Sequence, residues 1–241
     1  MYHFSGLAGF ERGINNKIVI TMTMVTSSIV SLLTLFTDYD MMAQEDPFSD
    51  IRSIAPIYDR MLRGETIRRT DPGFDILLED FHRALVYSQR IGSSTDYGEV
   101  RSLISEMTGS VLDDSVTIVP PIRFDHGRFS RFGRNVFVNS GAVFLDQGGI
   151  VIGDDVKIGP NVTFVTSNHP LDPDHRSDII SERITVGRNV WIGANVTVLP
   201  GVTIGDDAVV AACSVVTRDV PGGKLVMGSP ARVVKDVRET V

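Results

Sequence analysis

The chain has 241 residues, of which 42% are hydrophobic, and a formal net charge of −7. This length and composition suit one sizeable core with a smaller appendage, and they exclude a disordered chain. The negative charge argues against a nucleic-acid partner, so any anionic ligand needs a local basic cluster. The single cysteine, Cys213, excludes an intrachain disulfide and a cysteine-rich zinc site. It also fits a reducing compartment, and we expect a cytoplasmic protein.

An uncharged stretch runs from Ile18 to Phe36. Its length suggests a membrane segment, but its many Ser and Thr residues dilute the apolar content that a spanning helix needs. The alternative is that the natural protein begins at Met41 or Met42, where the sequence looks like the start of a cytosolic enzyme. We favour this alternative and treat residues 1–42 as an extension, with membrane contact only if the apolar stretch is retained.

Two segments before residue 110 have apolar residues at three- and four-residue spacing, which is typical of one face of a helix. The first contains Phe74, Leu77, Leu78, Phe81 and Leu85, and the second contains Val100, Leu103, Ile104 and Met107. Gly92-Ser93-Ser94 breaks the chain between them. Residues 43–110 are therefore predicted to form a small helical appendage that packs on a larger body.

A repeat with a period of six follows over residues 111–236. One apolar row consists of Ile118, Phe124, Phe132, Val138, Phe144, Ile152, Ile158, Phe164, Val186, Ile192, Val198, Ile204, Val210 and Val216. A second row consists of Val156, Val162, Ile184, Val190, Val196, Val202 and Ala208. Gly often follows the first row, and Asn or Asp often comes next, which predicts a tight turn after each short strand.

Short strands joined by repeated corners wind into a coil, and stacked coils bury the apolar rows in a continuous ladder. The repeat predicts a mainly β protein, with a parallel β-helix over residues 111–236 and a tail at residues 237–241. Its register slips by two residues at His126-Gly127 and at Gln147-Gly148-Gly149, and it is interrupted from about Thr166 to Arg183. Loops that leave a rigid scaffold often carry function, so the interruption is the first place to look for a site.

Three segments carry a family resemblance: NHPLDP at residues 168–173, ITVGRNVWIGANVTVLPGVTIGDDAVVAACSVVTRDVP at residues 184–221, and GSPARVVK at residues 228–235. On these segments the chain resembles the maltose and galactoside O-acetyltransferases of the hexapeptide-repeat superfamily. The resemblance implies a left-handed parallel β-helix and a homotrimer, with acetyl-CoA and acceptor meeting between subunits. It also implies acetyl transfer, without a metal, to a hydroxyl of a sugar or glycoside.

His169 matches the catalytic histidine of that family. An alcohol must lose its proton as it attacks a thioester carbonyl, and imidazole titrates near neutral pH, so a histidine suits the general base. The implied mechanism is direct transfer within a ternary complex, with no acyl-enzyme. Asn139 matches a residue that contacts the acceptor, and Asp125 and Gln147 fall at further acceptor positions, where relatives commonly differ.

The resemblance also implies an acetyl-CoA cleft lined by Ala194, Ala212, Thr217, Arg218, Arg232 and Lys235. The alanines allow close backbone approach to the pantetheine arm, and the three cations suit phosphate groups. Related enzymes place an acidic sugar-binding residue in the N-terminal segment, where this chain reads Ile67-Arg68-Arg69-Thr70-Asp71-Pro72. Asp71 is the nearest candidate for that residue, and the arginines suggest an altered or anionic acceptor.

Other interpretations of the same residues stay open. His169, His175 and the nearby aspartates suggest a metal site, but three ligands with fixed spacing are not evident. Cys213 occupies a small-residue position of the repeat, which favours packing in a corner over a nucleophile. The acceptor is alternatively a non-sugar compound or a polysaccharide precursor, and a silent β-helix scaffold is a rival from another class.

Overall fold

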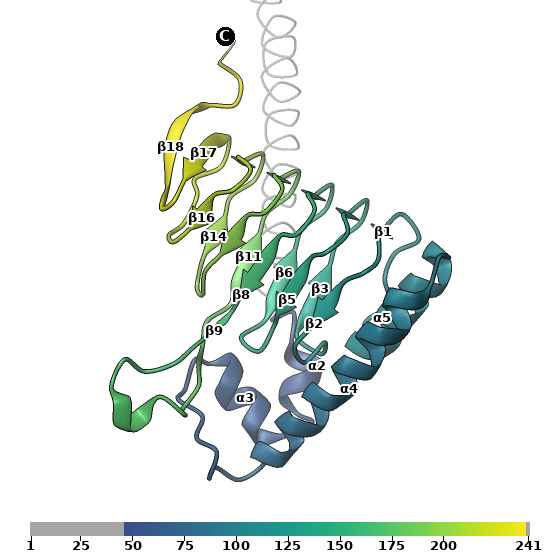
Figure 1. Cartoon of the computed structure of the whole chain (residues 1–241), viewed down its shortest axis with the longest axis vertical. Coiled ribbons are helices and arrows are strands. Elements are labelled where there is room, and N and C mark those ends of the chain that lie inside the picture. Colours follow the sequence, from purple (N-terminus) through teal and green to yellow (C-terminus); the bar gives the residue numbers. More distant parts are fainter. Residues whose placement is uncertain (1–45, 240–241) are drawn as a thin grey trace, which may run out of the picture. The chain divides into compact units, whose positions relative to one another are not determined.

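The structure is a computed structural model and describes residues 46–239. The strands of the chain form a parallel β-helix (Figure 1). The predictions on residues 1–42 lie outside the described residues. Within residues 46–239, none of the helices has the length and apolar character needed to cross a bilayer.

Three sheets form the sides of the β-helix in the described part of the chain. The first contains β1 (Thr117–Ile118), β4 (Phe137–Val138), β7 (Lys157–Ile158), β12 (Trp191–Ile192), β15 (Val209–Val210), β17 (Lys224–Gly228) and the antiparallel β18 (Ala231–Asp236). The second contains β2 (Arg123–Phe124), β5 (Val143–Leu145), β8 (Thr163–Val165), β13 (Thr197–Val198) and β16 (Val215–Val216). The third contains β3 (Ser130–Phe132), β6 (Ile150–Ile152), β11 (Ile184–Val186) and β14 (Thr203–Ile204).

The apolar row predicted from the period of six divides among these sheets and stacks in register. In the second sheet Phe124 pairs with Phe144, and Phe144 pairs with Phe164. Their ring centroids are 5.1 Å and 5.0 Å apart, and all three side chains are buried. Backbone hydrogen bonds join successive turns, so each turn is completed by its neighbours. The parallel β-helix prediction is confirmed.

The corners between strands use the left-handed backbone conformation that Asn, Asp and Gly tolerate. Positive φ angles occur at Asn135, Asp155, Asn161, Asn189, Asn195, Asp207 and Cys213. Glycine is required where turns stack most closely, since a Cβ on Gly193 would lie 2.6 Å from the backbone N of Ala212. These corners explain the Gly and Asn that follow the apolar row.

Asn195 allows a test of the corner geometry, because its φ is 56° and its side chain makes no hydrogen bond within the described residues. Asn195→Ala is expected to lower the free energy of unfolding by about 1 kcal/mol, since asparagine adopts the left-handed conformation more readily than alanine does. Asn195→Gly is expected to stay closer to wild type. Denaturant unfolding followed by circular dichroism checks this, and equal losses in both variants would contradict it.

Four helices precede the β-helix in the described part of the chain: α2 (Ser49–Arg52), α3 (Pro56–Leu62), α4 (Phe74–Ser93) and α5 (Tyr97–Thr108). The predicted apolar face of α5 is buried. It packs in one core with the β-helix, whereas α2 and α3 belong to a second apolar cluster that includes Phe129. The helices and the β-helix form one compact unit.

The helix α4 exists as predicted, but only part of its predicted apolar face is buried, since Leu77 is 2% exposed. Phe81 and Leu85 are 42% and 46% exposed, whereas Asp80 and Ala84 are buried. The small Ala84 lets α4 approach β2, and Asp80 accepts hydrogen bonds from Tyr58 and from Arg128 (2.7 Å to Arg128 Nε). Part of the apolar stripe of α4 is therefore left to line surface cavities.

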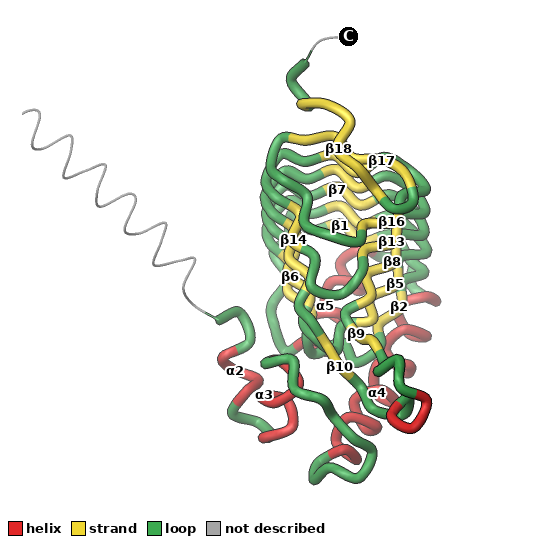
Figure 2. The backbone as a smooth tube through the Cα atoms, turned by 90° about the vertical axis from the view of Figure 1, so that its left-hand side faces the viewer, coloured by secondary structure: helices red, strands yellow, loops and turns green. Residues whose placement is uncertain are grey.

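The interruption of the repeat forms an excursion from the β-helix, as predicted (Figures 1 and 2). Its stem pairs β9 (Ser167–Asn168) with the antiparallel β10 (Ile180–Ser181), and a 3-10 turn (Pro173–His175) lies between them. Ile67, between α3 and α4, exchanges two backbone hydrogen bonds of 2.8 Å with Ile179. The N-terminal helical segment therefore ties down the end of the excursion.

Candidate active site

His169 lies in the excursion, directly after β9. Its Nδ1 lies 2.8 Å from the backbone oxygen of Asp178, and its backbone N–H donates to Asn168 Oδ1 at 2.8 Å. Because a carbonyl oxygen only accepts, Nδ1 carries the hydrogen and Nε2 of the neutral imidazole keeps its lone pair. The β9–β10 hairpin therefore presents a histidine in a defined tautomer.

Asp178 is itself held in place from several sides. Its side chain is buried, and Oδ2 lies 3.6 Å from Arg68 Nε and 3.4 Å from His175 Nδ1. The next residue, Ile179, makes the paired hydrogen bonds to Ile67. The carbonyl that orients His169 is therefore fixed by the excursion and by the N-terminal segment together.

His169 lines a cavity of about 280 Å³ that also includes residues of α4. The polar lining consists of Arg69, Asp125, His126, Gln147, His169, Arg176 and Ser177, and the apolar lining of Phe74, Leu77, Leu78, Phe81 and Ile179. Asp125 and Gln147 come from the two register slips of the repeat. The structure therefore brings Asp125 and Gln147, two of the four predicted acceptor residues, into one cavity with His169.

His126 is a further member of this cavity that the sequence analysis did not single out. It is 3% exposed, its Nε2 lies 3.3 Å from Gln147 Nε2, and its Nδ1 lies 3.4 Å from Asp125 Oδ2. Within residues 46–239 its buried Nδ1 makes no hydrogen bond. The signal available in the sequence was its position at the first register slip, directly after Asp125.

Asp146 ties the two register slips together. It is fully buried; Oδ1 accepts from the backbone N–H of His126 (2.9 Å) and Gly127 (3.0 Å). Oδ2 accepts from the N–H of Phe129 (3.1 Å) and the hydroxyl of Ser130 (3.0 Å). Burial raises the pKa of Asp146, and the backbone donors oppose that shift. This carboxylate positions the segments that carry Asp125 and Gln147.

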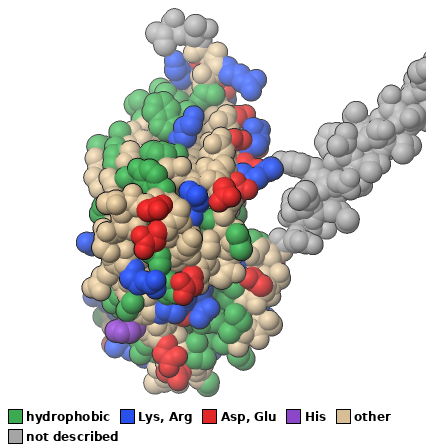
Figure 3. Space-filling view, turned by 90° about the vertical axis from the view of Figure 1, so that its right-hand side faces the viewer, with side chains coloured by type: hydrophobic (Ala, Val, Ile, Leu, Met, Phe, Trp, Pro, Cys, Tyr) green, Lys and Arg blue, Asp and Glu red, His purple; other side chains and the backbone are tan. Residues whose placement is uncertain are grey.

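Asn139 lies on a different face from His169. It follows β4 and lines a groove of about 640 Å³ along the first sheet, together with Ala194 and Ala212. Trp191 and Phe137 also line this groove and are 59% and 37% exposed. Figure 3 shows hydrophobic side chains exposed in patches on one face of the β-helix, among charged ones. His169, Asp125 and Gln147 thus line the cavity, whereas Asn139, Ala194 and Ala212 line the groove.

The other predicted cofactor residues lie near the C-terminal end of the β-helix. Thr217 and Arg218 follow β16, and Arg232 and Lys235 belong to β18. Lys235 is in register with Leu225, which lines the groove. Within the described residues, neither Arg218 nor Arg232 nor Lys235 forms an ion pair with an acidic side chain. These cations are available to an anionic ligand.

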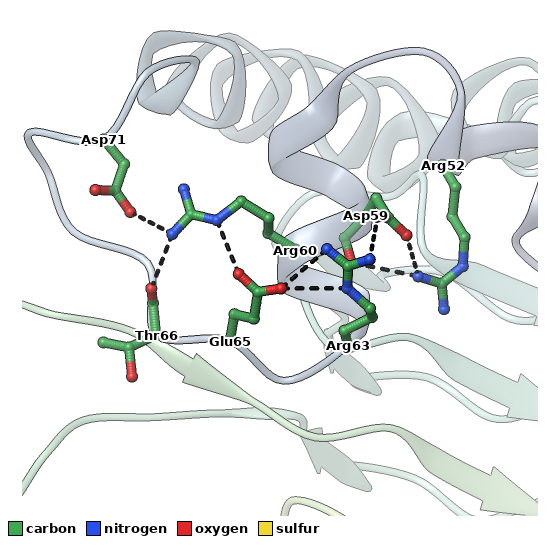
Figure 4. Close-up of polar contacts among 7 residues, drawn as sticks. All are labelled: Arg52, Asp59, Arg60, Arg63, Glu65, Thr66 and Asp71. Atoms are coloured by element: carbon green, nitrogen blue, oxygen red, sulfur yellow. Dashed lines mark hydrogen bonds and ion pairs between the residues drawn. The ribbon is translucent and has the colours of Figure 1, made fainter.

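Asp71 lies in a turn before α4 and belongs to a surface network of charged residues (Figure 4). Its Oδ2 accepts from the backbone N–H of Arg68 at 3.1 Å and from Arg60 at 2.9 Å. These two donors hold the pKa of Asp71 below its usual range. Arg69, and not Asp71, lines the cavity of His169. An acceptor-binding role for Asp71 stays a prediction.

The sequence also suggests a metal site near His169 and a packed side chain for Cys213. Within residues 46–239 no group of three or more His, Cys, Asp or Glu side chains is arranged to hold a metal ion. Cys213 occupies a corner with a φ of 59°, but its side chain is exposed. The expectation that Cys213 is packed in the corner is therefore wrong, because its left-handed backbone turns the side chain outward.

Comparison with known proteins gives consistent matches. Residues 183–218 match the family described as bacterial transferase hexapeptide (six repeats). The galactoside O-acetyltransferase of Escherichia coli (strain K12) is 36% identical over 159 residues, which are 65% of this chain and 78% of that protein. The match is therefore not confined to the repeat.

Solved structures that resemble this chain are acetyltransferases as well. The maltose O-acetyltransferase of Clostridium difficile 630 is 32% identical with a TM-score of 0.70, covering 76% of this chain and 97% of that one. The hexapeptide-repeat containing acetyltransferase of Vibrio cholerae O1 biovar eltor, complexed with acetyl coenzyme A, is 34% identical with a TM-score of 0.64, covering 75% and 98%. With its β-helix, its excursion and relatives matched over most of their length, this chain belongs to the hexapeptide-repeat acetyltransferases, the acyltransferase family of the galactoside and maltose O-acetyltransferases.

Proposed function

We propose that this protein transfers the acetyl group of acetyl-CoA to a hydroxyl of a sugar or glycoside, with His169 as the general base. The observation that carries the proposal is the hydrogen bond from His169 Nδ1 to the Asp178 carbonyl, 2.8 Å long. It leaves Nε2 as the basic atom, in a cavity that also holds Asp125 and Gln147. Relatives named as galactoside and maltose O-acetyltransferases support the substrate class.

The chemistry follows from that geometry. The acceptor hydroxyl gives its proton to His169 Nε2 while its oxygen attacks the thioester carbonyl carbon. Positive charge on the imidazole is stabilised because Nδ1–H still donates to the Asp178 oxygen. The tetrahedral intermediate then expels the thiolate of CoA, and Nε2–H returns the proton to the sulfur. Donors in the cleft stabilise the oxyanion, and no acyl-enzyme is formed.

The groove along the first sheet is the proposed site of the donor. The small side chains of Ala194 and Ala212 leave it open where the pantetheine arm would lie, and Trp191 gives it an apolar wall. The phosphate groups of CoA need cations in a chain whose net charge is −7. Arg218, Arg232 and Lys235 are the proposed phosphate ligands, together with Thr217 as a neighbouring donor.

A homotrimer is proposed because the donor groove and the cavity of His169 lie apart in one chain. Closed symmetry would place the groove of one subunit against the excursion of the next, so that Asn139 and His169 meet from different chains. The exposed Trp191 and Phe137 support such a partner, since contiguous apolar surface is commonly covered.

Steady-state kinetics test the direct transfer. With acetyl-CoA and acceptor varied together, thiol release is expected to give intersecting double-reciprocal lines, because both substrates bind before chemistry. Mass spectrometry after mixing with acetyl-CoA alone should find unmodified protein. Parallel lines together with an acetylated side chain would contradict direct transfer, and acetyl-CoA binding without turnover on any hydroxyl compound would favour the scaffold alternative.

A further inference from the structure

We propose that the acceptor carries an anionic group, a carboxylate or a phosphate on its sugar ring, which Arg69 and Arg176 bind. This inference rests on the proposed acetyl transfer at His169. Both arginines line the same cavity as His169, one from the segment before α4 and the other from the excursion. The ligand class therefore concerns the acceptor and not the donor.

The two guanidinium groups lack acidic partners. Within residues 46–239 Arg69 makes no hydrogen bond or ion pair, and Arg176 makes only a 3.5 Å hydrogen bond to the carbonyl of Leu171. Arginines nearby behave differently, since Arg60 pairs with Glu65 and Asp71 (Figure 4). The acidic side chains Glu65 and Asp71 are thus paired with Arg60, and Arg69 and Arg176 stay available to an anionic ligand.

The charge balance of the cavity favours an anion. Asp125 is the one carboxylate among its lining residues in the described chain, and it lies beside His126. Against it stand two guanidinium groups, in a protein whose net charge is −7. Guanidinium groups bind carboxylates and phosphates with paired hydrogen bonds, whereas a neutral sugar offers no counter-charge.

The size of the cavity limits the acceptor. Its volume of about 280 Å³ is near the lower end of ligand pockets, which begin at roughly 300 Å³. The half-exposed Phe81 and Leu78 supply an apolar wall for the C–H face of a ring. One sugar ring with one anionic substituent matches this volume, this wall and the two arginines.

The test compares three acceptors that differ only at one ring substituent: a methyl glycoside, its 6-carboxylate and its 6-phosphate. Thiol release from acetyl-CoA is expected to show the highest kcat/KM with one of the two anionic forms, and the better form identifies the group. Arg69→Gln and Arg176→Gln should each lower kcat/KM for that acceptor by about 10- to 100-fold, the value of a charge-assisted hydrogen bond. The loss should be larger for the anionic acceptor than for the neutral glycoside, because only the anion pairs with a guanidinium group.

Arg90→Gln is the matched control, because Arg90 is an exposed arginine of α4 outside the lining of the cavity. Arg69→Glu should reverse the preference, favouring an amino sugar over the anionic form. Equal turnover of neutral and anionic acceptors, unaffected by the arginine variants, would overturn this inference and leave the proposed function standing. Absence of transfer to every acceptor would overturn the proposed function, and with it this inference.

Discussion

Replacement of His169 by alanine is expected to lower kcat for acetyl transfer by about 10²- to 10⁴-fold, the usual contribution of a general base. The Asp178 carbonyl fixes Nδ1–H, so Nε2 is the proton acceptor that the variant loses. Acetyl-CoA binding should be unchanged, because the proposed donor groove lies on another face. Thiol release and titration of CoA into the variant measure the two effects separately.

His169→Asn is the control for the shape of the excursion. An asparagine amide can still donate to the Asp178 oxygen at the position of Nδ1, but it offers no basic nitrogen. We expect this variant to be as inactive as His169→Ala and as stable as wild type. Turnover near the wild-type rate in His169→Asn would contradict the general-base role and would assign the histidine a structural one.

Mixed assemblies test whether two chains build each site. Ala212→Trp fills the groove while leaving His169 intact, so it should be inactive alone. When chains with His169→Ala and chains with Ala212→Trp assemble at random, about a quarter of intersubunit sites should have both parts intact. Recovery of activity near that level supports the shared site. No recovery from well-mixed assemblies would mean that each chain is self-sufficient.

The β-helix could be predicted from the sequence because its period is local. Each row residue, such as Phe144 or Ile158, contacts its equivalents one turn away, so burial follows the repeat itself. The burial of α4 could not be predicted in this way. Its inner face is decided by close approach at Ala84 and by the ion pair of Asp80 with Arg128, and both depend on elements distant in the sequence.

The cavity of His169 also combines features that the local sequence predicts with features that depend on distant elements. The excursion was evident as an interruption of the repeat, and its histidine was evident from its motif. The meeting of Asp125, Gln147 and Arg69 was not, because it depends on α4 and on the pairing of Ile67 with Ile179. The two register slips appeared in the sequence as unrelated irregularities, and only the buried Asp146 shows that they form one structure.

Asp146→Ala is expected to lower the free energy of unfolding by at least about 3 kcal/mol, because each buried donor left unpaired costs about 1–3 kcal/mol. Four donors lose their acceptor, three of them backbone N–H groups. The same change should raise KM for the acceptor more than it lowers kcat. This is because the two segments that Asp146 positions carry Asp125 and Gln147, whereas the ring of His169 is oriented separately by the carbonyl of Asp178. Denaturant unfolding and acceptor kinetics of the variant measure these two effects.

Asp154→Ala is the matched control for that loss. Asp154 also accepts a hydrogen bond from a backbone N–H of the preceding turn, that of Arg134, at 2.7 Å. The side chain of Asp154, however, is 34% exposed. Water can replace the lost acceptor at this position, so the expected cost is only about 1 kcal/mol. If both variants lost the same small amount of unfolding free energy, Asp146 would not be what joins the two register-slip segments. The positions of Asp125 and Gln147 would then have to come from the packing of α4 alone.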